Sequence, residues 1–427
     1  MHYKRLLVIS HNCFSQTGSN GRTLANYLTG WPKESIAQFY IHAEQPDFNI
    51  CNQYFCMTDS SVLRSIINRK PAGYIVDDKD TNINTVKAVG QYKKKIIKNS
   101  LFFHFRELIW ESCFWNSIGF EQWVENFSPE VILVQAGDAG FLFTIAVSIS
   151  KKYQAPIVIY NTEGYYFKKV SYLSENMVSR PFYRCLNRKF KKSYDKLVHA
   201  SKAEVYNCDM LRDNYKNIFH NDSRVIMNTS EFTEEDVTID KKKQIIYAGN
   251  LGVGRHKSLI EFADALQTVA PDMVVDVYGK APDDTIKAEL KSCSGIKLHD
   301  FIPYEELKQK LRESRYLLHV ESFASFYKED LKYAFSTKIA DSLAVGSCLF
   351  VYAPENMAVI RYLEGKEAAV LITDPKKLEE QISRVLNDDT LSQTYAETGR
   401  ILAMENHNIK KNRAEFQSVL LSGEEIK

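Results

Sequence analysis

The sequence contains little of what would place it outside ordinary globular proteins. Its 427 residues include only 11 prolines and 18 glycines, with 44% hydrophobic and 25% charged residues, which excludes fibrous and largely disordered chains. The formal net charge is only +2 and no nucleic-acid module is recognisable, so we expect no nucleic-acid partner. Eight cysteines are scattered without a CxxC pair or a Cys/His cluster at metal-ligand spacing. These absences predict a reduced compartment and no structural zinc.

Long apolar runs are also absent. The first ten residues lead directly into a strand-like stretch and lack the apolar core and cleavage site of a secretory signal. No stretch approaches the roughly 18 apolar residues of a spanning helix, and even the aromatic segment 101–120 carries Arg106, Glu107 and Glu111. We therefore expect a cytoplasmic protein whose membrane contact, if any, is peripheral on the inner face of the plasma membrane.

Short apolar runs alternate with segments of helical periodicity along the chain, a pattern typical of βαβ units that form a parallel sheet. In the first half, the expected strands are 5–10, 37–41, 131–135, 157–160 and 196–200. In the second half, they are 245–248, 274–278, 296–298, 316–320, 349–351 and 369–372. One domain usually takes about 100–200 residues, so two such series predict an α/β chain of two doubly wound, Rossmann-like domains facing each other across a cleft.

The expected domain boundary lies in a polar, charged stretch. Residues 229–244 lack sustained apolar periodicity, so we expect a linker there. This assigns 1–228 to an N-terminal domain and 245–390 to a C-terminal domain. The helical stretch 391–427 follows the last expected strand and could pack back on the N-terminal domain.

In open α/β sheets, ligands bind beyond the carboxyl ends of the strands, so loops in those positions are candidate sites. The first such loop has the sequence HNCFSQTGSNGR, whose glycines let the backbone approach a ligand closely. We expect an anionic or hydroxylated ligand there, and an ordinary Gly-containing turn is the alternative. The candidate residues are Gly18, Ser19, Asn20 and Gly21.

A second loop, YAGNLGVGRHKS at 247–258, combines flexibility with positive charge. Gly249 and Asn250 begin it, and Arg255 and Lys257 follow where their cations could neutralise a diphosphate. A surface loop with solvated basic residues is the alternative.

A third segment, FSTKIADSLAVG at 335–346, resembles the start of a capped helix. Ser336 and Thr337 are good N-cap residues, and a helix N-terminus next to Lys338 suits a pyrophosphate. Asp341, one turn later, could accept hydrogen bonds from a ribose diol. A simple i,i+3 ion pair on a capped helix is the alternative.

A fourth loop, LHDFIPYEEL at 298–307, could flank a nucleobase with Phe301 and Ile302, or it is a plain turn.

The order and spacing of these pieces resemble the family 4 glycosyltransferases of the GT-B fold. The matching stretches are AGNLGVGRHKSLIEF, DFIPYEELKQKL and STKIADSLAVGSCLFVYAPE. The resemblance implies a nucleotide-sugar donor on the C-terminal domain and a saccharide or lipid-linked saccharide acceptor on the N-terminal domain.

Carried over by position, the resemblance implies that Lys257 and Lys338 bind the donor diphosphate, that Ser336 and Thr337 cap it, and that Asp341 holds the ribose. The sequence departs from the family pattern at two positions. Asn250 replaces the usual basic residue, for which Arg255 could substitute. Tyr333 stands where the family places an acidic residue against the donor sugar; Glu321, Glu329 or Asp330 could serve instead. Glu163 is the acidic candidate on the acceptor side.

The resemblance also implies transfer with retention of configuration, in which the departing donor phosphate takes the proton of the acceptor hydroxyl. The protein then orients both substrates and neutralises charge. No metal and no other cofactor are expected for such a site. The only DxD-like element, at 78–80, lies in a polar run and indicates a solvated loop rather than the metal site of a GT-A enzyme.

Two segments, 87–115 and 165–196, combine cations with aromatic residues on the acceptor-side domain. Such a surface predicts contact with anionic lipid, or alternatively a solvated helix face with a buried aromatic side.

The resemblance suggests capsule, O-antigen or another bacterial surface polysaccharide as the product. Two other functions stay open: a nucleotide-sugar epimerase, and a catalytically silent nucleotide-sugar-binding or scaffold protein, which Tyr333 in place of an acidic residue would suit.

Overall fold

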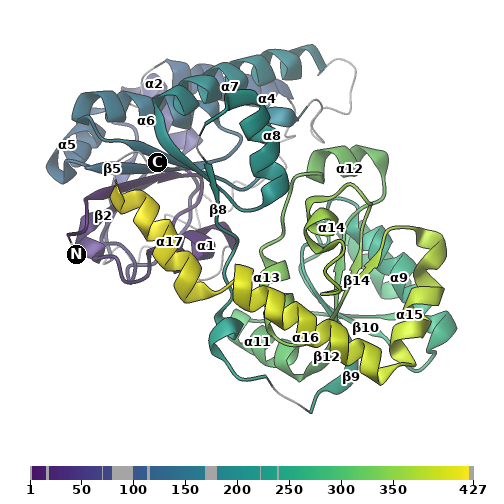
Figure 1. Ribbon diagram of the computed structural model, residues 1–427. Coiled ribbons are helices and arrows are strands. Elements are labelled where there is room, and N and C mark those ends of the chain that lie inside the picture. Colours follow the sequence, from purple (N-terminus) through teal and green to yellow (C-terminus); the bar gives the residue numbers. More distant parts are fainter. Residues whose placement is uncertain are drawn as a thin grey trace. The chain divides into compact units, whose positions relative to one another are not determined.

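The computed structural model describes residues 2–15, 19–69, 71–78, 100–112, 116–168, 180–221, 223–237 and 240–422. The chain divides into two compact units, shown in Figure 1. The first unit comprises Met1–Ile226 together with Arg413–Lys427, and the second comprises Met227–Asn412. Each unit is built around its own sheet.

The first unit has an eight-stranded sheet in the order β4-β3-β2-β1-β5-β6-β7-β8. Only the edge pair β3–β4 is antiparallel. The strands are β1 Leu6–Ser10, β2 Ile36–Tyr40, β3 Gln53–Cys56, β4 Tyr74–Val76, β5 Val131–Ala136, β6 Ile157–Asn161, β7 Ser201–Tyr206 and β8 Ser223–Val225. The central strands β1, β2, β5 and β6 are buried along their whole length, as expected for a parallel sheet covered by helices on both faces.

The helices of the first unit cover both faces of this sheet (Figure 1). They are α1 Ser19–Leu28, α2 Asp59–Asn68, α4 Ser100–Glu111, α5 Ile118–Phe127, α6 Gly140–Tyr153, α7 Arg180–Ala200 and α8 Asp209–Phe219, with short 3-10 turns η1 Lys33–Ser35 and η2 Tyr165–Phe167. The C-terminal helix α17, Ile409–Ser422, completes the unit with its residues from 413 onward. Its Phe416 is fully buried and stacks on Tyr27 of α1, with the ring centroids 4.4 Å apart.

The second unit has a six-stranded parallel sheet in the order β11-β10-β9-β12-β13-β14. Its strands are β9 Lys242–Ala248, β10 Val275–Tyr278, β11 Ile296–His299, β12 Ser314–Val320, β13 Cys348–Tyr352 and β14 Val370–Ile372. Its helices are α9 Arg255–Val269, α10 Asp284–Ser292, α11 Tyr304–Glu313, α12 Ser325–Leu331, α13 Lys338–Ala344, α14 Ala358–Leu363, α15 Leu378–Leu386 and α16 Asp389–Asn406, with η3 Glu231–Glu234 and η4 Pro375–Lys377.

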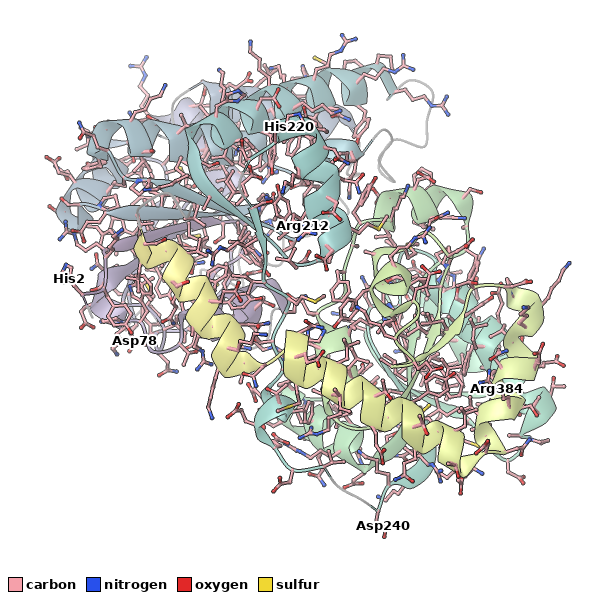
Figure 2. All side chains as sticks on the ribbon, viewed as in Figure 1. His2, Asp78, Arg212, His220, Asp240 and Arg384 are labelled. Carbon is pink, nitrogen blue, oxygen red and sulfur yellow. The ribbon has the colours of Figure 1, made fainter. Side chains whose placement is uncertain are left out.

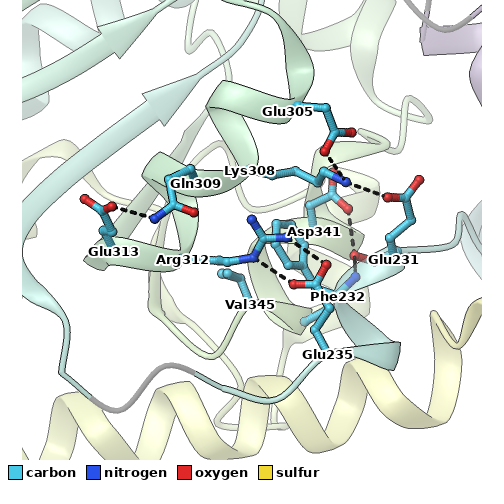
Figure 3. A network of polar contacts seen from close by, with 12 residues as sticks. Glu231, Phe232, Glu235, Glu305, Lys308, Gln309, Arg312, Glu313, Asp341 and Val345 are labelled. Carbon is cyan, nitrogen blue, oxygen red and sulfur yellow. Dashed lines mark hydrogen bonds and ion pairs between the residues drawn. The ribbon is translucent and has the colours of Figure 1, made fainter.

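The stretch 229–244, expected as a linker, belongs to the second unit. Figure 3 shows two of its acidic residues, Glu231 and Glu235, held by basic residues of α11. Lys308 Nζ lies 2.8 Å from Glu231, and the Arg312 guanidinium donates two 2.8 Å hydrogen bonds to Glu235. Phe232 of η3 is buried. Two of the charged residues that suggested a linker are therefore paired within the second unit.

Most expected strands are confirmed to within one to three residues, but 196–200 is wrong as a strand. These residues end α7, and the strand β7 begins only at Ser201. The buried positions Phe190, Tyr194, Leu197 and Val198 recur with helical spacing, so the apolar run is the inner face of a helix. Three short strands, β3, β4 and β8, were not predicted. The helical stretch expected across 391–427 contains two helices, α16 and α17, separated at His407 and Asn408.

Candidate functional site

Each sheet has a topological switch point, which is where ligands bind in open α/β folds. In the first unit, the strand order runs outward on both sides of the neighbours β1 and β5. In the second unit, it does so on both sides of β9 and β12. At both switch points, the structure places an ion pair between the loops that follow the two strands.

The ion pair of the second unit joins Arg255 and Glu321. Arg255 is the first residue of α9, in the loop segment after β9, and Glu321 directly follows β12. The guanidinium donates from Nε and Nη2 to the two carboxylate oxygens, at 2.9 Å each. The side chains are only 14% and 5% exposed, respectively. Two residues that the sequence assigned to different roles therefore form one buried, bidentate pair.

Glu321 is held ionised by its surroundings. Burial opposes its ionisation, but the contacts with His319 and Arg255 outweigh burial and lower its pKa. His319 Nε2 lies 3.3 Å from a carboxylate oxygen of Glu321, and Ser258 Oγ donates a 2.9 Å hydrogen bond to the backbone carbonyl of Glu321. This leaves Glu321 poorly suited to the sugar-contacting role expected from sequence and well suited to holding Arg255 at the start of α9.

The glycine loop before α9 has a defined shape. Gly254 has φ +78°, and a Cβ there would lie 2.4 Å from Ser322 Oγ, so only glycine fits. Asn250, which stands in place of a basic residue, accepts a 2.8 Å hydrogen bond from the backbone N–H of Gly252 through its side chain. Lys257 is exposed on the first turn of α9. The loop thus presents Lys257 outward while Asn250 shapes the turn.

The segment around α13 is arranged differently from the expectation. Thr337 is the N-cap but its side chain makes no capping hydrogen bond, whereas Ser336 Oγ accepts a 3.4 Å bond from the N–H of Lys338. Asp341 is 7% exposed and both its carboxylate oxygens already accept hydrogen bonds. Ser230 Oγ donates at 2.7 Å and the Tyr304 hydroxyl at 2.9 Å. Asp341 therefore ties η3 and α11 to α13, as Figure 3 shows in part.

The remaining donor-side candidates lie at the surface. Phe301 is 72% exposed and Ile302 is half-buried in the loop after β11. Glu329 is exposed on α12. Burial of the Tyr333 hydroxyl, and then the charge of Glu329, raise the pKa of Tyr333. Gly249 donates its N–H to the Tyr278 carbonyl at 3.0 Å.

The ion pair of the first unit joins His11, after β1, and Asp138, after β5. His11 Nε2 lies 3.1 Å from Asp138 Oδ1. The imidazole is 14% exposed, whereas the carboxylate is 51% exposed. Partial desolvation opposes ionisation of Asp138, but contact with His11, followed by the charges of Arg106 and Lys168, outweighs it and lowers the pKa of Asp138, so the carboxylate is charged. Gly137 lies so close that a Cβ there would be 2.1 Å from the His11 ring.

A second histidine follows the neighbouring strand β2. The His42 ring lies edge-on to His11 at 5.8 Å between centroids, and its Nδ1 is 3.1 Å from the Asn12 amide. Burial, with added repulsion from His11 and Arg106, lowers the pKa of His42 to about 4, so it is neutral at pH 7. Arg106 itself is bound by Asp59 through its Nε. The carboxyl edge of β1, β2 and β5 is thus lined by polar groups that hold one another in place.

The expected acceptor-side residues lie around this edge. Glu163, after β6, is 3.8 Å from Lys168, whose Nζ also lies over the Tyr165 ring. Gly21 packs against the backbone of its own loop, where a Cβ would meet the Cys13 carbonyl at 2.2 Å. Ser19 and Asn20 begin α1, and Gly18 lies outside the described residues. Lys79 and Asp80 of the DxD-like element and the lysines of 87–98 also lie outside them.

Sequence reasoning missed His11, Asp138 and His42. A signal was present, because each directly follows a strand at the carboxyl edge, and His11 opens the loop that was singled out for its glycines. Among the residues that the structure describes, no group of three His, Cys, Asp or Glu side chains could hold a metal ion. In the same part of the chain, no helix is long and apolar enough to cross a membrane.

Comparison with known proteins agrees with this geometry. Residues 255–418 match a protein family described as glycosyl transferase-like. HepE of Anabaena, solved with UDP, superposes with a TM-score of 0.65 at 10% identity, covering 98% of this chain and 100% of HepE. The sucrose-phosphate synthase of Thermosynechococcus elongatus superposes with a TM-score of 0.62 at 10% identity, covering 97% of this chain and 98% of the synthase. The lipopolysaccharide outer core galactosyltransferase WaaB superposes with a TM-score of 0.57 at 12% identity, covering 98% of this chain and 99% of WaaB.

No curated protein matches the chain by sequence. The structural likenesses show the fold, and the matched region 255–418 spans the Arg255–Glu321 ion pair and α13. The expected fold is confirmed, because the chain has the GT-B fold. Its residues 255–418 match the glycosyl transferase-like family, which supports the expected enzyme class.

Proposed function

We propose that the protein transfers a sugar from a nucleotide-sugar donor, bound by the second unit, to a saccharide or lipid-linked saccharide bound by the first. The observation that carries the proposal is the switch point of the second unit. There the 15-residue helix α9 begins directly after the glycine loop, its first residue Arg255 pairs with Glu321, and Lys257 is exposed on its first turn. Backbone N–H groups and cations at such a position suit a diphosphate.

UDP is the donor nucleotide that we propose first. Structures similar to this chain were solved with UDP and with UDP-glucose, at 10–11% identity. In this chain Lys257 and Lys338 would neutralise the diphosphate, and Asp341, whose carboxylate accepts hydrogen bonds from Ser230 and Tyr304, would also accept one from a ribose hydroxyl. No metal is needed in this arrangement, and we propose retention of configuration with the leaving phosphate as proton acceptor.

A bacterial surface polysaccharide is the proposed product. WaaB, a galactosyltransferase of the lipopolysaccharide outer core, and TarM are among the structures that this chain resembles, at 12% and 8% identity. The support is the shared fold and the matched family region, together with the exposed carboxylate on the first unit that could bind a hydroxylated acceptor.

Thermal unfolding in the presence of nucleotides tests the donor. We expect UDP at about 100 times its Kd to stabilise the protein by about 2.7 kcal/mol, which raises Tm by roughly 5–10 °C for a unit of this size. GDP, CDP, ADP and TDP are the matched comparisons. A shift with GDP alone would change the proposed donor, and no shift with any nucleotide would favour a silent scaffold. Turnover of the nucleotide sugar to its epimer without an acceptor would indicate an epimerase.

We also propose peripheral contact with an anionic membrane through α7. Five cations recur at four-residue spacing on the exposed side of this helix: Arg180, Arg184, Arg188, Lys192 and Lys196. None of them has an ion-pair partner among the residues that the structure describes. Figure 2 shows blue-tipped side chains projecting from α7. Phe182 on this helix and Phe105 on α4, against which α7 packs, are 38% and 56% exposed. Cations beside exposed aromatic rings suit anionic headgroups.

Vesicle sedimentation tests this contact. We expect the protein to bind phosphatidylcholine vesicles only when they contain phosphatidylserine, and less tightly as salt rises. Arg184→Glu combined with Arg188→Glu should weaken binding by about 30-fold or more, since each cation near the surface contributes about 1 kcal/mol. Arg384→Glu, an exposed arginine on α15, is the control of equal sign. Equal weakening by the control would mean that net charge, not α7, determines binding.

A further inference from the structure

The two segments by which the chain enters and leaves the second unit are bonded to each other inside that unit. The chain passes from one unit to the other twice, after Ile226 and after Asn412. Beside these crossings, the Asn412 amide donates a 2.9 Å hydrogen bond to the Met227 carbonyl. The backbone N–H of Ser230 donates a 3.0 Å hydrogen bond to the His407 carbonyl. The position of Ser230 therefore depends on a segment that lies far from it in sequence.

His407, which directly follows α16, is held through both nitrogens of its ring. The side chain is fully buried, and burial lowers its pKa to about 4, so the ring is neutral at pH 7. Nδ1 lies 2.7 Å from the Asn228 carbonyl, and Nε2 lies 3.0 Å from the Tyr362 hydroxyl. Because a carbonyl can only accept, Nδ1 carries the ring hydrogen and Nε2 accepts from the hydroxyl. The orientation of the ring is thereby fixed.

Ser230 connects this histidine with Asp341. Its backbone N–H is bonded to the His407 carbonyl, while its Oγ donates a 2.7 Å hydrogen bond to Asp341 Oδ1. From the other side, the Tyr304 hydroxyl donates a 2.9 Å hydrogen bond to Asp341 Oδ2. Each oxygen of the Asp341 carboxylate is thus held by a hydroxyl group. The carboxylate cannot rotate without breaking one of these two bonds.

The ring of His407 also lies beside the segment that leads into α13. It is nearly parallel to the ring of Phe335, with the centroids 6.4 Å apart and 16° between the planes. Phe335 is buried, and its ring lies edge-on to that of Tyr362 at 5.3 Å. Three residues further along the chain is Lys338, which the proposed function places at the donor diphosphate. His407 therefore has contacts that lead to both Asp341 and Lys338.

We infer that Ser230 and His407 are positioning residues of the donor site, which hold Asp341 in the orientation that accepts a ribose hydroxyl. His407 acts through Ser230, and Ser230 acts through Asp341. The inference rests on the proposed function and adds the residues that make recognition of the ribose depend on the C-terminal crossing. A carboxylate that is held in place beforehand loses little freedom when the ribose binds, so its hydrogen bond contributes more to affinity.

Calorimetric titration of the full chain with UDP, 2′-deoxy-UDP and 3′-deoxy-UDP tests this role. The ratio of the Kd of a deoxynucleotide to that of UDP reports the ribose contact, because a change at the diphosphate affects both nucleotides equally and cancels. For the wild type we expect a ratio of about 10 or more with at least one deoxynucleotide, the loss of one hydrogen bond to a charged group. In Ser230→Ala this ratio should fall to about 3 or less, since the carboxylate is freed.

Matched variants separate positioning from stability. Ser230→Thr keeps the hydroxyl and should keep the wild-type ratio. Ser392→Ala removes an equally buried hydroxyl of the second unit, bonded to Arg315 and Asp389 instead, and should leave the ratio unchanged. Transfer at saturating donor should persist in Ser230→Ala, while the KM for the donor rises.

Tyr362→Phe tests the part of His407 without removing its ring. It deletes the hydrogen bond to Nε2, so the ratio should fall in the same direction as in Ser230→Ala. Combining the two changes should lower the ratio no further than Ser230→Ala alone, because Tyr362 acts through Ser230.

Three results would overturn the inference. The first is an unchanged ratio in Ser230→Ala. The second is a raised ratio, which would mean that Ser230 competes with the ribose for Asp341. The third is a wild type that binds UDP and both deoxynucleotides equally well. A wild type that binds none of these nucleotides would instead count against the proposed donor, and the inference would fall with it.

Discussion

Replacing Glu321 by Leu should lower the free energy of unfolding by roughly 3–5 kcal/mol, the largest stability loss that we expect from a single substitution at the donor side. The reason is the buried pair with Arg255. Removal of the carboxylate leaves a guanidinium whose side chain is only 14% exposed without its bidentate partner. Urea denaturation followed by circular dichroism measures the loss.

Two matched variants give this result its meaning. Arg255→Met combined with Glu321→Leu should recover most of the loss, because no buried charge is then left uncompensated. Lys242→Ala breaks a pair with Glu313 in which the lysine is 66% exposed, and should cost about 0–1 kcal/mol. If Glu321→Leu were no worse than Lys242→Ala, the pair would not stabilise the second unit. If the double variant also kept the UDP-induced Tm shift, Arg255 would not contact the diphosphate.

Asp341→Ala should reduce transfer at least about 100-fold and also destabilise the protein by roughly 1–3 kcal/mol. Activity falls because Asp341 would lose the ribose contact, and stability falls because the hydroxyls of Ser230 and Tyr304 lose their common acceptor inside the protein. Released UDP measures transfer and urea denaturation measures stability.

Two further variants separate these effects. Ser230→Ala removes one internal donor but leaves the carboxylate, so stability should fall while transfer persists. Lys338→Ala should abolish transfer with a stability change within about 0.5 kcal/mol, since Lys338 is only half-buried. Transfer that survives in Asp341→Ala would assign this residue a purely structural role.

Most strands of the two sheets could be predicted because they contain short apolar runs. Where the prediction failed, a local pattern was ambiguous: Leu197 and Val198 are apolar neighbours that fit a strand, yet only the longer spacing from Phe190 and Tyr194 identifies a helix. The edge strand β4 is three residues long with two exposed side chains, and carries almost no apolar signal.

The candidate site was predictable by loop but not by contact. The loop after β9 and the segment of α13 were identified from glycine, serine and lysine patterns. No local pattern could show that Arg255 meets Glu321, or that Asp341 meets Ser230, because these pairs form only when segments distant in sequence become neighbours. For the same reason, His11 and Asp138 were overlooked: each is unremarkable until β1 and β5 lie side by side.

The discontinuous first unit has a consequence for synthesis. The fully buried ring of Phe416 belongs to its core, against Tyr27, yet residues 227–412 of the other unit are made in between. A nascent chain emerging from the ribosome therefore holds all eight strands of the first sheet long before the helix that covers Tyr27 exists. The second unit, which is contiguous in sequence, is the only one of the two that can finish folding without waiting for a distant segment.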